Sequence, residues 1–206
     1  MWDKFLSDFG SGLHPGGELL TKKIILGSET LSGKALDIGC GTGTSCALLS
    51  ESGFEAFGID SDAGFVQKAR LTACSAEIIQ GDMNLLPYED SFFDLVLCEC
   101  VLSTLSDKEK PLMEMQRVLK AGGRLAWSDL CSKNDDGSWS LSDWSSVVRA
   151  SGFINISIFS ADEEWRAFAA KILWSGADLR DFAACLCLGI PAKDMSYCYG
   201  FAQKSV

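Results

Sequence analysis

The sequence predicts an α/β fold built on a largely parallel sheet. Short apolar runs alternate along the chain with stretches of helical periodicity, a pattern typical of βαβ units. A glycine-rich loop separates the first apolar run from the helical stretch that follows it. The run LVLC at 95–98 is almost continuously apolar, as expected of a strand that helices cover on both faces.

Seven segments have the length and composition of strands. The first five lie in the first two thirds of the chain, and each of the first four ends close to a Gly, Asp or Glu. In chain order, the predicted strands are Ala35–Ile38, Glu55–Ile59, Glu77–Gln80, Phe93–Cys98, Arg124–Ser128, Ile154–Phe159 and Ser196–Ala202.

Helical patterns fill most of the intervals between these strands. We expect helices over Gly17–Leu26, over Asp62–Cys74 with Asp62 as its N-cap, and over Leu141–Ser151 before Gly152. A further helix begins near Asp107, and a glycine pair is expected to end it because glycine readily adopts the left-handed conformation of a helix stop. Its apolar stripe is Leu112, Met115, Val118 and Leu119, and the pair is Gly122-Gly123.

The segment from Ala161 to Met195 breaks the simple alternation of strand and helix. It contains two helix-like stretches, Glu163–Trp174 and Leu179–Leu188, and the first carries an apolar stripe. Two interpretations stay open at this stage. The segment either packs against the sheet or forms a lid over a binding site.

The composition narrows the class of protein. The chain has 206 residues, which suits one domain, and a formal net charge of −10. That charge argues against a nucleic-acid-binding protein, which normally carries a basic stripe. The sequence shows neither a targeting signal nor an apolar run of membrane-spanning length. We therefore expect a cytoplasmic protein whose nine cysteines are reduced thiols.

The loop at residues 36–45, LDIGCGTGTS, is the strongest sign of a binding site. Gly39, Gly41 and Gly43 allow a tight turn and the close approach of a ligand. The third glycine comes one residue too early for a dinucleotide fingerprint, since position 44 is Thr44. The loop also lacks the lysine of a phosphate-binding P-loop. Pyrophosphate and triphosphate ligands are therefore disfavoured.

Acidic residues stand where successive strands end. Asp60 follows the loop by about 20 residues, where a carboxylate can accept both hydroxyls of a ribose. Asp62 is better placed to cap the next helix, which leaves Asp60 free for a ligand. The pair Asp82-Met83 could contact an adenine, although Met83 could equally be a packing residue. Glu99 ends the fourth strand, so the sequence predicts a ligand crevice at the carboxyl ends of the strands.

These motifs together resemble those of class I S-adenosylmethionine-dependent methyltransferases. The matching segments are LDIGCGTGTS, GIDSD, GDMNLLPYEDSFFDLVLC and RVLKAGGRLAWSDL, which fall within about residues 34–130. The resemblance implies a Rossmann-like, doubly wound sheet of seven strands with the last strand antiparallel and helices on both faces. It also implies one domain: cap helices in 1–33, a cofactor-binding core in 34–130, and a C-terminal part in 131–206 with a two-helix insertion at 161–195.

The resemblance assigns S-adenosyl-L-methionine as the cofactor and a small molecule as the substrate. It places Asp37, Gly39, Gly41 and the Cys98 backbone at the methionine part, Asp60 at the ribose, and Ser61, Asp82 and Met83 at the adenine. The front helix, within GLHPGGELLTKKII, would lie beside the cofactor. The cofactor-binding residues implied in this way are Asp37, Gly39, Gly41, Gly43, Asp60, Ser61, Asp82, Met83 and Cys98.

The acceptor side of the site is less determined by the sequence. Methyl transfer from a sulfonium depends mainly on alignment, so a general base is optional. Glu99 and His14 are the candidate catalytic residues, although Glu99 could instead bind the methionine amine. His14 stands in an H-P-G-G context that favours a turn. Ser103-Thr104 stand where many small-molecule methyltransferases carry histidines, so no histidine base is expected there.

The cysteines allow an alternative acceptor. Cys98-x-Cys100 and Cys185-x-Cys187 do not have zinc-site spacing, and we expect no metal. The segment CECVLSTL and Cys46 also resemble arsenite methyltransferases, which bind trivalent arsenic through thiolates; Cys100 matches one such position. Cys185, Cys187 and Cys198 would have to supply the other thiols. A second alternative is a non-catalytic S-adenosylmethionine-binding protein, since the fold does not imply the function.

Overall fold

The computed structural model describes residues 14–134, 139–176, 178–180 and 188–206. A mixed sheet of seven strands runs through the described part of the chain in the order β3-β2-β1-β4-β5-β7-β6. The strands β1 to β5 are parallel to one another, whereas β7 runs antiparallel to both β5 and β6. This topology confirms the predicted α/β class and the reversed last strand.

All seven predicted strands are present, each within a few residues of its expected bounds. Their bounds are β1 Gly33–Ile38, β2 Phe54–Asp60, β3 Glu77–Gln80, β4 Phe93–Glu99, β5 Leu119–Ser132, β6 Phe153–Ser160 and β7 Met195–Lys204. The central strands of the sheet are largely buried. In β4, Leu95, Val96 and Leu97 are fully buried, as their continuous apolar character predicted.

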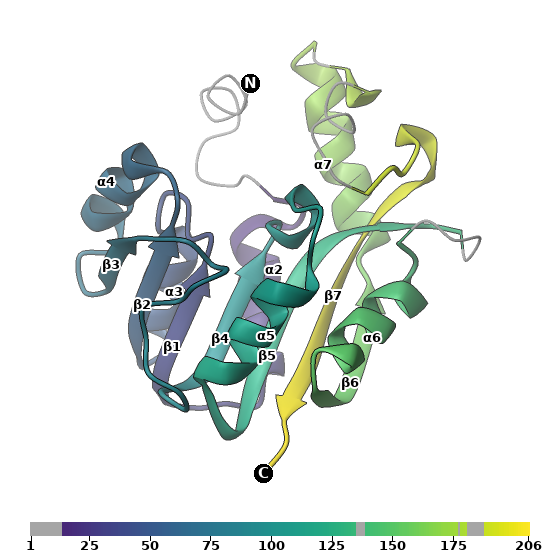
Figure 1. Ribbon diagram of the computed structural model, residues 1–206. Coiled ribbons are helices and arrows are strands. Elements are labelled where there is room, and N and C mark those ends of the chain that lie inside the picture. Colours follow the sequence, from purple (N-terminus) through teal and green to yellow (C-terminus); the bar gives the residue numbers. More distant parts are fainter. Residues whose placement is uncertain (1–13, 135–138, 177, 181–187) are drawn as a thin grey trace.

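Helices cover both faces of the sheet (Figure 1). On one face lie α2 (Gly17–Gly27), α3 (Thr44–Glu51) and α4 (Ala63–Thr72). On the other lie α5 (Glu109–Val118) and α6 (Leu141–Ala150). The short 3₁₀ helices η1 (Leu102–Thr104) and η2 (Ala192–Asp194) precede α5 and β7. None of the helices in these described residues has the length and apolarity to cross a membrane.

The helix α7 (Asp162–Trp174) rises beyond the end of the sheet beside β7 (Figure 1). It buries one face, formed by Trp165, Phe168 and Ile172, while Trp174 is exposed. These buried side chains fit the packing interpretation of the segment, and no residue of α7 lines the cavity described below. Most of the second predicted helix, Leu179–Leu188, lies outside the described residues.

The expected stop of α5 is wrong. The helix ends at Val118, and Leu119 already has extended backbone at the start of β5. The glycine pair Gly122-Gly123 falls inside β5, in a bulge: Phe93 pairs with Leu119, but Leu95 pairs with Arg124. Gly122 does have the left-handed conformation, with φ of 75°. The glycines therefore form a turn within the strand instead of ending the helix.

Glycine is required at the start of α3 for two reasons. Gly43 is the N-cap with φ of 85°, and a β-carbon there would lie 2.8 Å from Cα of Ala69 in α4. Gly53 has the similar φ of 92° but open space around it. A side chain at either position would strain the backbone. Only at Gly43 would it also overlap a neighbouring helix.

We predict that Gly43→Ala destabilises the protein more than Gly53→Ala does. Each substitution should cost about 1–2 kcal/mol for the left-handed backbone. Gly43→Ala should cost about 1–3 kcal/mol more because α4 must move away. Urea unfolding of both variants and the parent measures the difference. Equal losses for the two variants would show that α4 does not constrain this turn.

Candidate functional site

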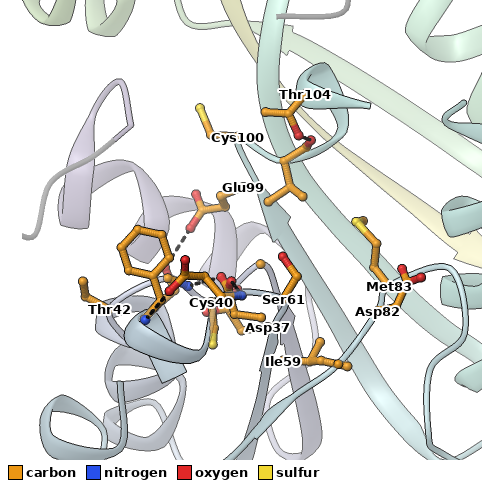
Figure 2. A pocket seen from close by; sticks show the side chains of 18 of the residues that line it. Asp37, Cys40, Thr42, Ile59, Ser61, Asp82, Met83, Glu99, Cys100 and Thr104 are labelled. Atoms are coloured by element: carbon orange, nitrogen blue, oxygen red, sulfur yellow. Dashed lines mark hydrogen bonds between the residues drawn. The ribbon is translucent and has the colours of Figure 1, made fainter. Parts of the chain in front are cut away.

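A cavity of about 620 Å³ opens where the strands β1 to β4 end (Figure 2). Residues that follow four different strands line it, because the carboxyl ends of parallel strands meet at one edge of the sheet. Asp82 and Met83 lie together at one side, and Glu99 and Cys100 lie together toward the other (Figure 2). The predicted ligand crevice is therefore present.

The glycine loop is tied to the end of β2 by backbone hydrogen bonds. The amides of Gly39 and Cys40 both donate to the carbonyl of Ile59, at 2.8 and 3.1 Å. The Gly41 amide donates to Oδ2 of Asp60 at 2.9 Å. Gly39 and Gly41 have positive φ, which lets the chain turn between β1 and α3 within this space.

The loop leads into the N-terminus of α3, which faces the cavity. The first amides of a helix have no partner within the helix and favour an anionic ligand. The hydroxyl of Thr44 is buried and has no hydrogen-bond partner among the described residues. Thr44 and Ser45 both line the cavity. A buried hydroxyl without a partner is costly, which makes Thr44 a candidate ligand-binding residue that the sequence did not reveal.

Asp62 has its predicted role, whereas Asp60 differs from the prediction in one respect. Asp62 caps α4 by accepting the amides of Gly64 and Phe65 at 2.7 and 2.9 Å, as predicted. Asp60, however, is not free. Its Oδ1 accepts the Asp62 amide at 2.9 Å, in addition to the bond from Gly41. Each carboxylate oxygen therefore keeps one further accepting position for a ligand.

The residues after β3 are held by a local turn. Oδ1 of Asp82 accepts both the backbone amide and the side-chain amide of Asn84, each at 2.8 Å. These hydrogen bonds lower the pKa of Asp82. Ser61 lines the same part of the cavity.

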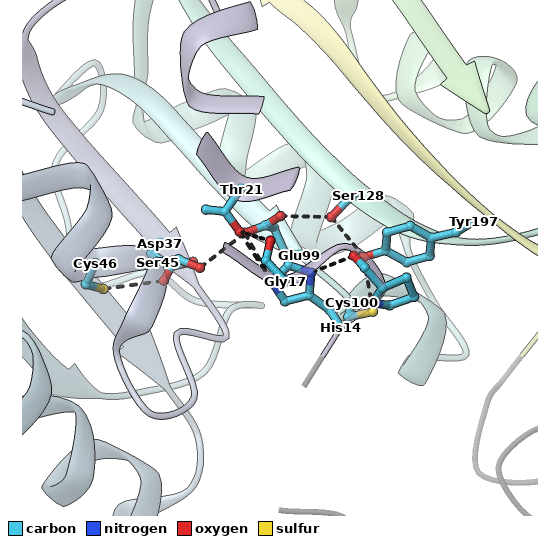
Figure 3. A network of polar contacts seen from close by, with 11 residues as sticks. His14, Gly17, Thr21, Asp37, Ser45, Cys46, Glu99, Cys100, Ser128 and Tyr197 are labelled. Atoms are coloured by element: carbon cyan, nitrogen blue, oxygen red, sulfur yellow. Dashed lines mark hydrogen bonds and ion pairs between the residues drawn. The ribbon is translucent and has the colours of Figure 1, made fainter. Parts of the chain in front are cut away.

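Glu99 is the centre of a buried network of hydroxyl groups (Figure 3). Its Oε2 accepts from Thr21 at 2.9 Å and from Ser45 at 3.1 Å, and its Oε1 accepts from Ser128 at 3.1 Å. The exposed fraction of the Glu99 side chain is only 4%. The three donors come from α2, α3 and β5, so Glu99 holds three elements together at the cavity.

The network extends to the thiol of Cys100. Tyr197 donates to Oγ of Ser128 at 2.9 Å, and Sγ of Cys100 lies 3.2 Å from the Tyr197 hydroxyl oxygen. Because Tyr197 has one hydroxyl hydrogen and donates it to Ser128, the Cys100 thiol must be the donor to Tyr197. The hydrogen bonds therefore run in one direction, from Cys100 through Tyr197 and Ser128 to Glu99.

His14 lies at the other end of this network. Its Nε2 is 3.3 Å from the Thr21 hydroxyl and 4.0 Å from Oε2 of Glu99, and its Nδ1 is 3.1 Å from the Pro15 carbonyl oxygen. The amide of Gly17 donates to the His14 carbonyl at 3.2 Å, so His14 does begin a turn, as its sequence context favoured. The same residue lines the cavity.

Asp37 is a second buried carboxylate at the cavity. Burial raises its pKa to about 8, and the negative charges of Glu99 and Asp60 contribute to the rise. A hydrogen bond from the Cys46 thiol, at 3.4 Å, opposes it. Asp37 therefore accepts a hydrogen bond from one thiol, whereas Glu99 accepts hydrogen bonds from three hydroxyl groups.

Most of the residues predicted to bind a cofactor lie at the cavity. Gly43 and Cys98 do not line it: Gly43 packs against α4, and the Cys98 side chain is buried in the sheet. Both candidate catalytic residues, Glu99 and His14, line it. The predicted residues among the cavity lining are Asp37, Gly39, Gly41, Asp60, Ser61, Asp82 and Met83.

Sequence reasoning placed the front helix that carries Thr21 beside the cofactor but missed the other members of the Glu99 network. Ser128 stands near the end of β5, where the strand-end rule would have marked it. Tyr197 comes from the antiparallel strand β7, and no local motif indicates that it reaches the same network. Ser45 is the last residue of the glycine-loop motif, and its hydroxyl was not assigned a role.

The cysteines are distributed over several environments. Of the described ones, only Cys40 and Cys100 line the cavity. Cys198 is buried and adjoins Tyr197 in β7, so the two side chains point to opposite faces of the sheet. Cys185 and Cys187 lie outside the described residues. In the described part of the chain, no three metal-binding side chains are grouped as a metal site.

Comparisons with known proteins place most of the cavity in a segment with known relatives. A family model described as a methyltransferase domain matches residues 36–127. A demethylmenaquinone methyltransferase from Renibacterium salmoninarum is 33% identical over 92 residues, which are 45% of this chain and 39% of that protein. The chain therefore spans less than half the length of that curated relative.

Two solved structures share the fold over nearly the whole chain. One is phosphoethanolamine N-methyltransferase 2 of Haemonchus contortus with S-adenosyl-L-methionine: its TM-score is 0.77 and its identity 17%, over 98% of this chain and 56% of that one. The other is the [4+2]-cyclase SpnF, with a TM-score of 0.76 and 22% identity over 96% of this chain and 85% of that one. At such identities the likeness concerns the fold alone.

The raised pKa of Asp37 predicts a specific pH dependence of stability. Its pKa is about 8 in the folded protein, against an ordinary value of 3.8 for an aspartate. Between these values the unfolded state loses the proton first, so stability falls as the pH rises. The free energy of unfolding should fall by at most about 1.4 kcal/mol per pH unit in this range. We predict that Asp37→Asn removes this fall.

Urea unfolding of parent and variant from about pH 5 to about pH 8 measures the effect. Asp129 is another buried acid, with a pKa raised to about 6, but it is present in both proteins and cancels in the difference. Parallel stability curves for the two proteins would mean that Asp37 ionises normally in the folded state.

Proposed function

We propose that this chain, which carries a class I S-adenosylmethionine-dependent methyltransferase domain, transfers the methyl group of S-adenosyl-L-methionine to a small-molecule acceptor. The observation that carries the proposal is the cavity at the strand ends. There the pinned glycine loop, the N-terminus of α3 and four successive acidic strand ends face one space. The methyltransferase-domain match over residues 36–127 contains the loop and all four of these strand ends.

The residues of the cavity fit the methionine part of the cofactor. Its carboxylate suits the N-terminus of α3, where the unpartnered hydroxyl of Thr44 can donate to it. Its ammonium group suits Asp37 and Glu99, two buried carboxylates on the adjoining strand ends. The positive charge of the ligand would also offset the repulsion between these two carboxylates.

The other side of the cavity fits the nucleoside. Asp60 keeps one accepting position on each carboxylate oxygen, which matches the two hydroxyls of a ribose. Ser61, Asp82 and Met83 are placed to contact the adenine, with Met83 as its apolar neighbour. Gly43 has no such place, and its role in this proposal is to let α3 pack against α4.

When bound, the cofactor supplies an electrophilic methyl group on a sulfonium. The protein's task is then to align an acceptor in line with that group, which can lower the barrier by roughly 7–11 kcal/mol. Glu99, Cys100 and His14 are the polar lining residues that we expect nearest to the sulfonium. The hydroxyl network fixes the position of Glu99, which can accept a hydrogen bond from the ammonium group or from the acceptor.

The charges and thiols of the cavity restrict the acceptor. Among its described lining residues there is neither lysine nor arginine, and five are acidic: Asp37, Asp60, Asp62, Asp82 and Glu99. A neutral or cationic acceptor therefore fits better than an anionic one. Arsenite is not favoured, because Cys100 has its thiol hydrogen bonded to Tyr197 and the neighbouring Cys198 points to the other face of the sheet.

We predict that the protein binds S-adenosylhomocysteine and S-adenosyl-L-methionine, and that each displaces the other. Isothermal titration calorimetry with both compounds, and with NAD as the control ligand, measures this. NAD should bind more weakly because the glycine spacing does not suit a pyrophosphate. Tighter binding of NAD than of either sulfur compound would overturn the proposed function.

We predict that Asp60→Ala weakens S-adenosylhomocysteine binding and that Asp62→Ala does not. Asp60 would lose charged hydrogen bonds to the ribose, each worth about 1.5–3 kcal/mol. Asp62→Ala removes only a helix cap and should cost about 1 kcal/mol of stability. Calorimetry and thermal unfolding of the two neighbouring variants separate affinity from stability. Equal losses of affinity would show that the ribose ligand is misassigned.

A further inference from the structure

Two cysteines lie together beneath the glycine loop. Cys40 is part of the loop itself and lines the cavity. Cys46 is in the first half of α3 and is fully buried. Both belong to a small apolar cluster that packs between α3, α4 and the sheet, separate from the main core.

The position of Gly58 shows how close the two sulfurs are. A β-carbon at Gly58, in β2, would lie 2.7 Å from Sγ of Cys46 and 3.0 Å from Sγ of Cys40. Both thiols therefore point into the same small space, which exists because residue 58 has no side chain. The backbone of Gly58 has no positive φ, so this space is a reason for glycine there.

The Cys46 thiol links the pair to the cavity. It donates a hydrogen bond to Oδ2 of Asp37 at 3.4 Å. The interaction with Cys40 raises the pKa of Cys46 well above its usual value, and burial and the charge of Asp37 raise it further. Cys46 is thus a protonated thiol, and Cys40 is the member of the pair that belongs to the cavity lining.

We propose that Cys40 and Cys46 are a redox modification site: an intramolecular disulfide forms between them and weakens cofactor binding. The statement about the cofactor rests on the proposed function, whereas the bridge itself does not. The bridge would close a ring that contains residues 41–45, which are the end of the glycine loop and the first two residues of α3. It would also remove the thiol hydrogen that Cys46 donates to Asp37.

The chemistry requires a hydroperoxide as oxidant. The Cys40 sulfur first takes an oxygen from the hydroperoxide, which is reduced to an alcohol and leaves a sulfenic acid. The Cys46 sulfur then attacks the Cys40 sulfur, and the sulfur–oxygen bond breaks. The hydroxide that leaves takes the proton of the Cys46 thiol and becomes water. Two electrons pass from the thiol pair to one hydroperoxide.

Other cysteines of the chain serve as controls for the Cys40–Cys46 pair. Cys131 and Cys198 form a second buried pair, on β5 and β7, in which each thiol interacts with the other. Neither residue lines the cavity. Cys74 is exposed and reports whether the oxidant was active in the sample.

The test is to treat the reduced protein with tert-butyl hydroperoxide, block remaining thiols with N-ethylmaleimide and map the peptides by mass spectrometry. We expect a Cys40–Cys46 cross-link with two hydrogens fewer than the thiol form. In calorimetry, the Kd for S-adenosylhomocysteine should rise roughly fivefold or more, the usual lower range of coupling between two sites. Dithiothreitol should restore it, and bound S-adenosylhomocysteine should slow cross-linking by linkage.

Matched variants assign the effect to this pair. The change in Kd on oxidation should disappear in Cys46→Ser and persist in Cys131→Ser. Oxidation of Cys74 without a Cys40–Cys46 cross-link in the parent would overturn the proposal, and this result needs no variant to fold. A cross-link that leaves the Kd unchanged would overturn it as well. Failure of the reduced protein to bind S-adenosylhomocysteine would instead contradict the proposed function.

Discussion

The hydrogen bonds between the glycine loop and the end of β2 fix the position of the loop at the cavity, and the start of α3 depends on them. Two loop amides converge on the Ile59 carbonyl, and a third reaches the Asp60 carboxylate. Because the loop leads directly into α3, these bonds also set the direction in which the first amides of that helix point. Asp60 therefore has a structural role in addition to its expected role as a ligand, since it holds the loop whose far side faces the same cavity.

The two buried carboxylates of the site are stabilised in different ways. Glu99 accepts hydrogen bonds from hydroxyls on three separate elements, and one of them continues through Tyr197 to Cys100. Asp37 has only a thiol as a side-chain donor among the described residues, and burial raises its pKa to about 8. A cationic ligand between them would favour the charged form of Asp37, because an opposite charge nearby lowers the pKa of a carboxyl group.

The sequence predicted the parts of the site that depend on local constraints. The strand ends follow from apolar runs, and the glycine loop and the Asp62 cap follow from backbone requirements that only certain residues meet. The stop of α5 was mispredicted because Gly122-Gly123 suits a turn in a bulged strand as well as a helix end. The contacts of Tyr197 and Ser128 depend on how β7 inserts into the sheet, and the space shared by Cys40 and Cys46 depends on Gly58 across a strand pair. Such relations are long-range and have no local signature.

The strand order carries a consequence for biosynthesis. β7 comes later in the chain than β6, yet it lies between β5 and β6, and β6 pairs with no other strand in the described sheet. While residues 195–204 are still inside the ribosome, β5 has an unpaired edge and β6 has no partner. Such unpaired edges are sites at which the nascent chain can associate with other chains until β7 emerges. Completion of the sheet and completion of the Tyr197–Ser128 contact occur in the same step, so the site is finished only when the half of the sheet that carries β6 closes.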